Sequence, residues 1–310
     1  MHINYGELMI NKSMPLVERF RYDCSGKWFK GNLHMHTSRS DGHLSLIDAS
    51  AYYLERGYDF ISITDHMVPF IGAESGEQLP IMILEGIELS GEDGQGSKCH
   101  VVCLGGVAGI SQDMPLLEAL EKARSQGSFL IWAHPYWSGN TVADVLRHQF
   151  HGMEVYNYLS EIAFGKGNGA FHWDSVLEQQ PDMLGLATDD NHFREDYPPQ
   201  VGGWIMVNAR ELSPEAIMAS IRKGNFYSSS GPAFKEIHLE KGNQVVAETS
   251  PIVHARLVGP ATKAKWQAEV DRKKMTKTSF TIPDDWAFAR LEIEDAFGKK
   301  AWSNPLLVTG

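Results

Sequence analysis

Two histidines one residue apart begin the series of side chains that could carry out chemistry in this sequence. His34 and His36 lie in NLHMH (32–36), whose alternation of apolar and polar residues predicts a strand. Because residues i and i+2 of a strand point to the same face, both imidazoles are expected to converge. Imidazole is a common ligand of zinc and iron. Taken alone, however, the pair is equally compatible with two exposed histidines.

Further histidines and carboxylates occupy corresponding places along the chain. Most come at or just after the carboxyl end of a predicted strand, and in parallel α/β architectures these ends form the rim where active sites lie. His100 instead opens a strand, so it joins the rim only through a locally reversed strand or a loop. The set comprises Asp41, His66, Glu88, His100, His134, Asp189, Asp190 and His192. So many ligand-type residues at matching places predict one metal-binding cluster.

The elements that must position these residues alternate between strands and helices. Strands are predicted at 32–36, 60–64, 81–89, 100–105, 129–134, 152–157, 183–188 and 202–209. Helices are predicted at 46–57, 114–127, about 141–148, 171–179 and 213–224. Ser213 is suited to the N-cap of the last helix and Pro214 to its first position. This alternation favours an α/β barrel or a wound sheet of parallel strands.

The pattern changes after about residue 232. Short alternating segments with turn residues between them predict a small, mostly β domain over 233–310, in which only 263–275 could form a helix. The metal ligands all fall within 31–232, which we expect to form the barrel domain. Residues 1–30 are expected to be an N-terminal extension that packs on the barrel.

The ordered motifs HMHTSRSDG, ITDH, GIELS with CHVVCLG, AHP and DDNH resemble those of the PHP (polymerase and histidinol phosphatase) superfamily. The resemblance covers about residues 30–232. It implies a distorted seven-stranded (β/α) barrel with a site for two or three metals. WDSVLEQQ, ATDDNHF, GWIMVNARELSPEAIMASIRKGNFYSSSGP and a terminal WSNP resemble one branch, the CehA/McbA-type metallohydrolases. This closer likeness would extend over 233–310.

The resemblance also implies which side chains share each ion. Four would hold the first ion: His34, His36, Glu88 and Asp190. Three would hold the second: Asp41, His66 and His192. Glu88 would bridge to a third ion, completed by His100 and His134. The superfamily's Asp-x-His ending matches Asp190-Asn191-His192. Asp189 is therefore expected to lie behind the ligands and to orient a ligand histidine.

Such a site is suited to hydrolysis. Three divalent ions bring six positive charges and three carboxylates return three negative ones, so the site stays net positive and suits a phosphate or another oxyanion. Ions about 3.5–4 Å apart can share a water and lower its pKa to about 7. The expected nucleophile is a metal-bridging hydroxide. Mixed imidazole and carboxylate ligands suit manganese, iron or zinc better than magnesium.

Residues beside the ligands are candidates for contact with substrate. Arg39 precedes Asp41 in its loop and Arg194 follows His192, so either guanidinium could reach a phosphate; His43 could protonate a leaving group. Each is also readily explained as a surface residue. Tryptophans near the motifs could shape an apolar pocket, although core packing is the default for them: Trp132, Trp137 and Trp173.

Composition limits the class of protein. The formal net charge of −11 argues against non-specific binding to nucleic acid. No apolar run approaches the roughly 18–20 residues of a membrane helix, and the first thirty residues lack the apolar stretch of a secretory signal. Three cysteines form no disulfide framework and fit a reducing compartment. We expect a cytoplasmic protein without membrane or nucleic-acid partners. The sequence leaves open whether the protein forms an oligomer.

Three functions are compatible with these observations. The first is a phosphoesterase that hydrolyses a small phosphate ester. The second is hydrolysis of a carboxylic ester, amide or carbamate at the same metals. The third is a non-catalytic binding module that metals hold together. Completeness of the ligand set favours an enzyme with a small anionic substrate.

Overall fold

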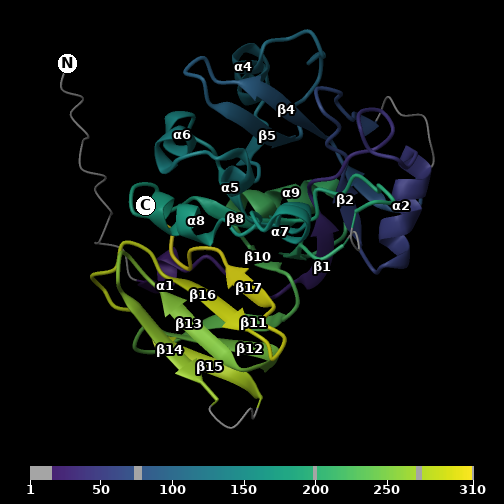
Figure 1. Ribbon diagram of the computed structural model, residues 1–310. Helices are drawn as coiled ribbons and strands as arrows, with labels where there is room; N and C mark the ends of the chain where they lie inside the picture. The colour runs from purple at the N-terminus through teal and green to yellow at the C-terminus, as the bar shows by residue number, and fades with distance from the viewer. Residues whose placement is uncertain (1–15, 73–78, 198–200, 270–273, 309–310) are drawn as a thin grey trace, which may run out of the picture.

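The computed structural model describes residues 16–72, 79–197, 201–269 and 274–308 and has a mixed α/β fold (Figure 1). Residues 1–15 of the predicted N-terminal extension lie outside the described residues. The rest of the extension contains α1 (Leu16–Arg19) and contacts the end of the chain. Arg19 Nε donates to Val308 O (3.0 Å), and Arg21 Nε donates to Pro305 O (2.7 Å).

A nine-stranded sheet runs through both predicted domains. Its order is β14 (Ala264–Ala268), β13 (His254–Val258), β16 (Arg290–Glu294), β17 (Lys300–Ser303), β10 (Phe226–Ser229), β9 (Trp204–Ala209), β1 (Lys27–Asn32), β2 (Phe60–Ser62) and β3 (Met82–Leu84). β1, β2 and β3 are parallel, and β17 pairs antiparallel with β10. The boundary predicted at residue 232 therefore falls within a continuous sheet.

A five-stranded sheet carries the remaining strands of the metal-binding part. Its order is β4 (Gly86–Glu92), β5 (Lys98–Leu104), β6 (Phe129–Trp132), β7 (Gly152–Asn157) and β8 (Leu184–Thr188). β5 is antiparallel to both neighbours, whereas β6, β7 and β8 are parallel. This reversal is the one that His100 requires, because the start of β5 then lies beside the carboxyl end of β4.

The predicted seven-stranded barrel is not confirmed. Among the described residues the strands separate into open sheets, and the nine- and five-stranded sheets share a core that includes Phe60, Ile131 and Val207. Isolated bridges join these two sheets at Met35–Asn191 and His66–Glu88. Single bridges, and not a continuous ladder of hydrogen bonds, thus hold together the strand ends that carry ligand residues.

Helices pack around these sheets. They are α2 (Leu46–Glu55), α4 (Leu116–Ser125), α5 (Pro135–Ser138), α6 (Val142–Arg147), α7 (Tyr158–Phe164), α8 (Ala170–Leu177) and α9 (Pro214–Lys223). The predicted cap of α9 is confirmed, because Ser213 Oγ accepts from Ala216 N (3.3 Å) with Pro214 at the first position. In the described part of the chain, every helix is too short or too polar to cross a bilayer.

Three predicted elements differ in the structure, and one of them, the strand at 81–89, is divided into β3 of the nine-stranded sheet and β4 of the five-stranded sheet. The strand at 32–36 ends at Asn32, because Met35 bonds to the Thr64 hydroxyl and backbone instead of continuing the ladder. The helix allowed over 263–275 is wrong for the described residues, since β14 occupies Ala264–Ala268 and pairs with β13 at the edge of the sheet. Residues 270–273 lie outside the described residues. The third sheet is formed by β11 (Phe234–Glu240), β12 (Gln244–Ile252) and β15 (Met275–Thr281).

Arg290 connects the strands after residue 232 to the preceding helices. It is buried in β16, and its Nε and Nη2 each donate to Asp174 of α8 at 2.7 Å. We expect Arg290→Ala to lower the free energy of unfolding by about 2–3 kcal/mol, because the buried side chain loses two charge-assisted hydrogen bonds and its packing over the Trp173 ring. Urea unfolding measures this. The control Lys263→Ala breaks a surface pair with Asp285 and should cost under about 1 kcal/mol; equal losses would contradict the expectation.

Candidate metal centre

The nine residues that the sequence predicted as ligands lie together in the structure. They come from six places: the segment after β1 with its loop, the ends of β2, β6 and β8, the middle of β4 and the start of β5. They form four overlapping groups in which the nitrogen and oxygen atoms lie within 4.8 Å of one another. The groups are His36, Asp41, His66 and His192; His34, Glu88 and His134; His34, His36 and Asp190; and His66, Glu88 and His100.

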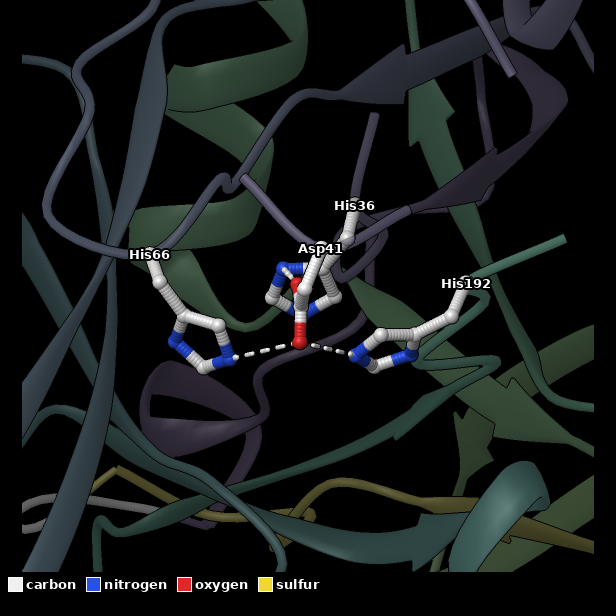
Figure 2. A group of neighbouring side chains, drawn as sticks. All are labelled: His36, Asp41, His66 and His192. Atoms are coloured by element: carbon white, nitrogen blue, oxygen red, sulfur yellow. Dashed lines mark ion pairs between the residues drawn. The ribbon is translucent and has the colours of Figure 1, made fainter. Parts of the chain in front are cut away.

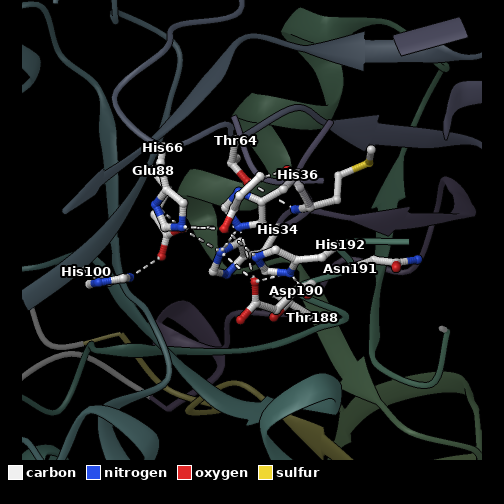
Figure 3. A network of polar contacts seen from close by, with 12 residues as sticks. His34, His36, Thr64, His66, Glu88, His100, Thr188, Asp190, Asn191 and His192 are labelled. Atoms are coloured by element: carbon white, nitrogen blue, oxygen red, sulfur yellow. Dashed lines mark hydrogen bonds and ion pairs between the residues drawn. The ribbon is translucent and has the colours of Figure 1, made fainter. Parts of the chain in front are cut away.

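The most buried part of the cluster has the spacing of a metal's coordination shell (Figure 3). His34 Nε2 and His36 Nε2 are 3.3 Å apart, and each lies 3.2 Å from Glu88 Oε2 and 3.2 Å from Asp190 Oδ1. A tetrahedral ion with ligand bonds of about 2.0–2.1 Å separates its ligand atoms by about 3.3 Å. His34, His36 and Asp190, which form one of the groups above, therefore fit one divalent ion, and Glu88 Oε2 lies beside the two histidine nitrogens.

A second group surrounds Asp41 (Figure 2). Asp41 Oδ2 lies 3.3 Å from His192 Nε2 and 3.7 Å from His66 Nε2, and Asp41 Oδ1 lies 3.5 Å from His36 Nδ1. The His36 ring lies between the other two, with centroid distances of 4.2 Å to His192 and 4.5 Å to His66. His36 thus presents one ring nitrogen to each group.

Glu88 links the groups through its two oxygens. Oε2 faces His34, His36 and His66, whereas Oε1 lies 2.9 Å from His100 Nδ1 and 3.3 Å from His134 Nε2. A carboxylate whose oxygens face separate sets of imidazoles is suited to bridge neighbouring ions.

Unpaired polar atoms in the cluster fit a positively charged partner. Glu88 Oε2, His36 Nδ1 and His66 Nδ1 are buried and make no hydrogen bond, although buried polar groups are normally satisfied. Burial lowers the pKa of His36, but Asp190 and Glu88 more than offset this and raise it to about 9. Burial raises the pKa of Glu88, yet His34 and the other imidazoles hold it well below its usual value. Divalent ions would supply this positive charge without protons.

Glu154, which the sequence analysis missed, orients several ligands. Its Oε1 accepts from His34 Nδ1 (2.7 Å), so the His34 Nε2 lone pair faces the cluster in the neutral ring. Its Oε2 accepts from the backbone N of His134 (2.7 Å) and from Asn157 Nδ2 (2.8 Å), which also donates to Asp190 (3.1 Å). The sequence did carry a sign of this role, because Glu154 lies inside the apolar strand GMEVYN and a buried acid needs partners.

We expect Glu154→Ala to weaken metal binding by about 10–100-fold, because residues that orient ligands have effects of this size. Titration of the metal-free protein with zinc measures it. The control Glu161→Ala removes an acid from α7 outside the cluster and should leave the affinity unchanged. Unchanged affinity in Glu154→Ala would contradict this role.

Asp189 does not orient a ligand histidine, so that prediction was wrong. Its carboxylate accepts from Gly202 N (2.7 Å), Gly203 N (2.8 Å), Tyr53 OH (3.2 Å) and Tyr58 OH (3.1 Å). Burial raises the pKa of Asp189 to about 6, although these donors lower it. Asp190 turns the other way because its backbone is left-handed, with φ of 53°. The structure thus directs Asp190 to the ligand cluster and Asp189 to the protein interior.

Left-handed backbone recurs where ligands are presented. His134 has φ of 26°, and Met67, directly after His66, has φ of 54°. Such conformations cost on the order of 1–3 kcal/mol each in residues other than glycine, and they concentrate at functional sites. Among the described non-glycine residues with left-handed backbone, four of seven are ligands or directly follow one.

Other predicted contact residues lie near the cluster. Arg39 Nη2 donates to Pro69 O (2.9 Å), and Arg194 pairs with Asp196 through two bonds of 3.1 Å. His43 is exposed, and its backbone N donates to His192 O (2.8 Å). Their roles toward a substrate stay predictions.

A cleft of about 90 Å³ opens onto the cluster. One side is formed by five predicted ligands: His66, Glu88, His100, His134 and Asp190. The other side includes Trp137, Leu159, Phe164 and Tyr197. Trp132 and Trp173 pack in the core, as expected for tryptophans by default, whereas Trp137 lines the cleft. This volume is far below the roughly 300–1,000 Å³ of pockets for larger ligands, so only a small group fits beside the metals.

Comparison with solved structures identifies the fold. The chain resembles a two-domain protein of Bacteroides vulgatus described as containing a predicted PHP-like metal-dependent phosphoesterase, with a TM-score of 0.50, 16% identity and coverage of 89% of this chain and 93% of that one. It therefore shares its fold with a PHP-like protein. The CehA/McbA branch is not confirmed. No protein-family profile and no curated protein sequence matches the chain.

Two further structures are similar over part of the chain. One is a protein of Bifidobacterium adolescentis provisionally assigned as a metal-dependent phosphoesterase, with a TM-score of 0.42, 12% identity and coverage of 55% of this chain and 91% of that one. The other is an amidohydrolase of Chromobacterium violaceum, with a TM-score of 0.37, 17% identity and coverage of 55% and 92%. Its structure contains sulfate and no metal.

Proposed function

We propose that the chain is a metal-dependent hydrolase and that it acts as a phosphoesterase on a small phosphate ester. The observation that carries this proposal is the placement of Glu88, whose two oxygens face separate sets of histidines. This arrangement suits ions close enough to share a water. Two or three divalent ions of manganese, iron or zinc would be held by the nine clustered residues.

Such ions supply an activated water and neutralise negative charge on a phosphate. The protein's own contribution is to fix the ligands before substrate arrives. Glu154 holds His34 in one tautomer, and Asn157 holds the Asp190 carboxylate. Glu88 is only 1% exposed, so its carboxylate is largely removed from water, which strengthens the electrostatic interactions that it makes.

A second candidate is hydrolysis of a carboxylic ester, amide or carbamate. One observation favours it: among the described residues that line the cleft there is no lysine or arginine. A neutral carbonyl group needs no such cation, whereas a phosphate would depend on the ions for its neutralisation. A non-catalytic module is the third candidate.

Turnover assays with defined metals separate the three. The protein is stripped with a chelator, reloaded with Mn²⁺, Fe²⁺ or Zn²⁺ and assayed with p-nitrophenyl phosphate, bis(p-nitrophenyl) phosphate and p-nitrophenyl acetate. We expect metal-dependent turnover of a phosphate ester that His66→Ala abolishes and His238→Ala, a control on β11, leaves intact. Turnover of the acetate alone would end the phosphoesterase proposal, and no turnover of any substrate would favour the binding module.

A further inference from the structure

The cleft has an apolar wall directly beside the metal ligands. Trp137 and Phe164 are 41% and 49% exposed, although large aromatic side chains are usually covered. Their ring centroids lie 6.1 Å apart at an interplanar angle of 49°. The Trp137 ring is 5.0 Å from the His134 ring and 6.2 Å from the His100 ring. Together with Leu159, these two rings are called the aromatic wall below.

The aromatic wall is fixed relative to the ligands. Trp137 lies in α5, the single turn that directly follows His134 and ends at Gly139 in the left-handed conformation. Leu159 and Phe164 lie in α7, whose N-cap Asn157 also donates to Glu154 and Asp190. Leu159 N donates to Asp189 O (3.1 Å). The aromatic wall is therefore already formed before a substrate binds.

Further exposed apolar side chains lie on the helices that carry the aromatic wall and on α8. They lie on α5, α7 and the start of α8, which are neighbours in Figure 1: Tyr136, Ile162 and Phe171. The Tyr136 and His172 rings, 6.2 Å apart, join α5 to α8.

We propose that the aromatic wall binds a planar apolar group of the substrate, so that the preferred substrate is an aryl phosphate ester. This inference rests on the proposed function. The small cleft admits the phosphate beside the ligands, and the ester oxygen leads out of it toward Trp137 and Phe164. Tilted rings about 6 Å apart can pack on the face and edge of an aryl ring. An ester with a small polar alcohol would leave both side chains in water.

The reaction is ordinary hydrolysis. The water oxygen forms a bond to phosphorus, and the bond between phosphorus and the aryl oxygen breaks. The products are inorganic phosphate and a phenol, whose oxygen receives a proton from the water. No further reactant is required.

Binding of non-hydrolysable phosphonates tests the aromatic wall without turnover. Phenylphosphonate and methylphosphonate are titrated into the metal-loaded protein by calorimetry. We expect phenylphosphonate to bind about tenfold more tightly, because burial of a phenyl ring adds apolar contact. In Trp137→Ala this preference should fall to about twofold or less. Trp137→Phe should restore most of it, and Trp266→Ala, which removes a 73% exposed tryptophan of β14, should keep it unchanged.

The outcomes distinguish this inference from the proposed function. Equal affinity for both phosphonates would overturn the aryl inference, and so would a preference for phenylphosphonate that Trp137→Ala and Phe164→Ala leave unaltered. In either case, turnover of phosphate esters would still uphold the proposed function. Failure of both phosphonates to bind, with no turnover of phosphate esters, would overturn both. A dimer that Phe164→Ala dissociates in sedimentation, with the phenyl preference unaltered, would show that a second copy covers the wall.

Discussion

Glu88→Gln is expected to lower kcat/KM for a phosphate ester on the order of 10³-fold, because it removes the bridging charge from the metal centre. Glutamine has nearly the same shape but offers one neutral oxygen and an amide nitrogen. The nitrogen would face imidazoles that lie 2.9–3.3 Å from the present oxygens. Elemental analysis of the purified variant should show fewer ions per chain than the wild type.

The control for this variant lies on the same strand. Glu92 ends β4 and is exposed, so Glu92→Gln makes the same chemical change away from the cluster. It should keep both the ion content and kcat/KM. Wild-type activity in Glu88→Gln, or equal losses in both variants, would contradict the bridging role.

Two adjacent aspartates are expected to fail in different ways. Asp190→Asn keeps a residue that tolerates the left-handed backbone, yet it should reduce ion content and lower kcat/KM by about 10²–10³-fold because a ligand charge is lost. Asp189→Ala leaves two backbone N–H groups and two tyrosine hydroxyls without their acceptor. It should lower the free energy of unfolding by at least about 3 kcal/mol.

Urea unfolding in chelator, together with metal analysis of both variants, checks this pair. The expected result is a large stability loss in Asp189→Ala and a large metal loss in Asp190→Asn. The reverse pattern would assign the ligand to Asp189 and contradict the geometry described above.

Much of the candidate site could be predicted because its residues lie at strand ends. Histidines at i and i+2 converge even though the strand stops at Asn32, since the following residues stay extended against Thr64. His100 was predicted to need a reversed strand, and β5 provides it. These features depend on local spacing and on strand direction, which sequence patterns report.

The features that could not be predicted depend on distant partners. Asp189 faces Tyr53 and Tyr58, which are far away in sequence, so its own neighbours gave no sign of this role. Glu154 looks like a strand residue until His34 is placed beside it. The strand at 264–268 needs the edge offered by β13, and the charged residues on both sides of it fit a helix equally well.

Aromatic residues show a related limit. Trp132, Trp137 and Trp173 were all candidates for an apolar pocket, yet of these three only Trp137 lies in the cleft. Its exposure follows from the single-turn helix after His134, whose left-handed backbone redirects the chain. The exposure of Trp137 therefore depends on the path that the chain takes after His134.

Metal content of the wild-type protein tests the central claim most directly. The protein is stripped with a chelator, reloaded with Zn²⁺ or Mn²⁺, passed through a desalting column and assayed by elemental mass spectrometry. Two or three ions per chain, falling in Glu88→Gln but not in Glu92→Gln, is the predicted result. Fewer than one ion per chain with every metal tried would contradict the claim that these nine side chains form a metal centre.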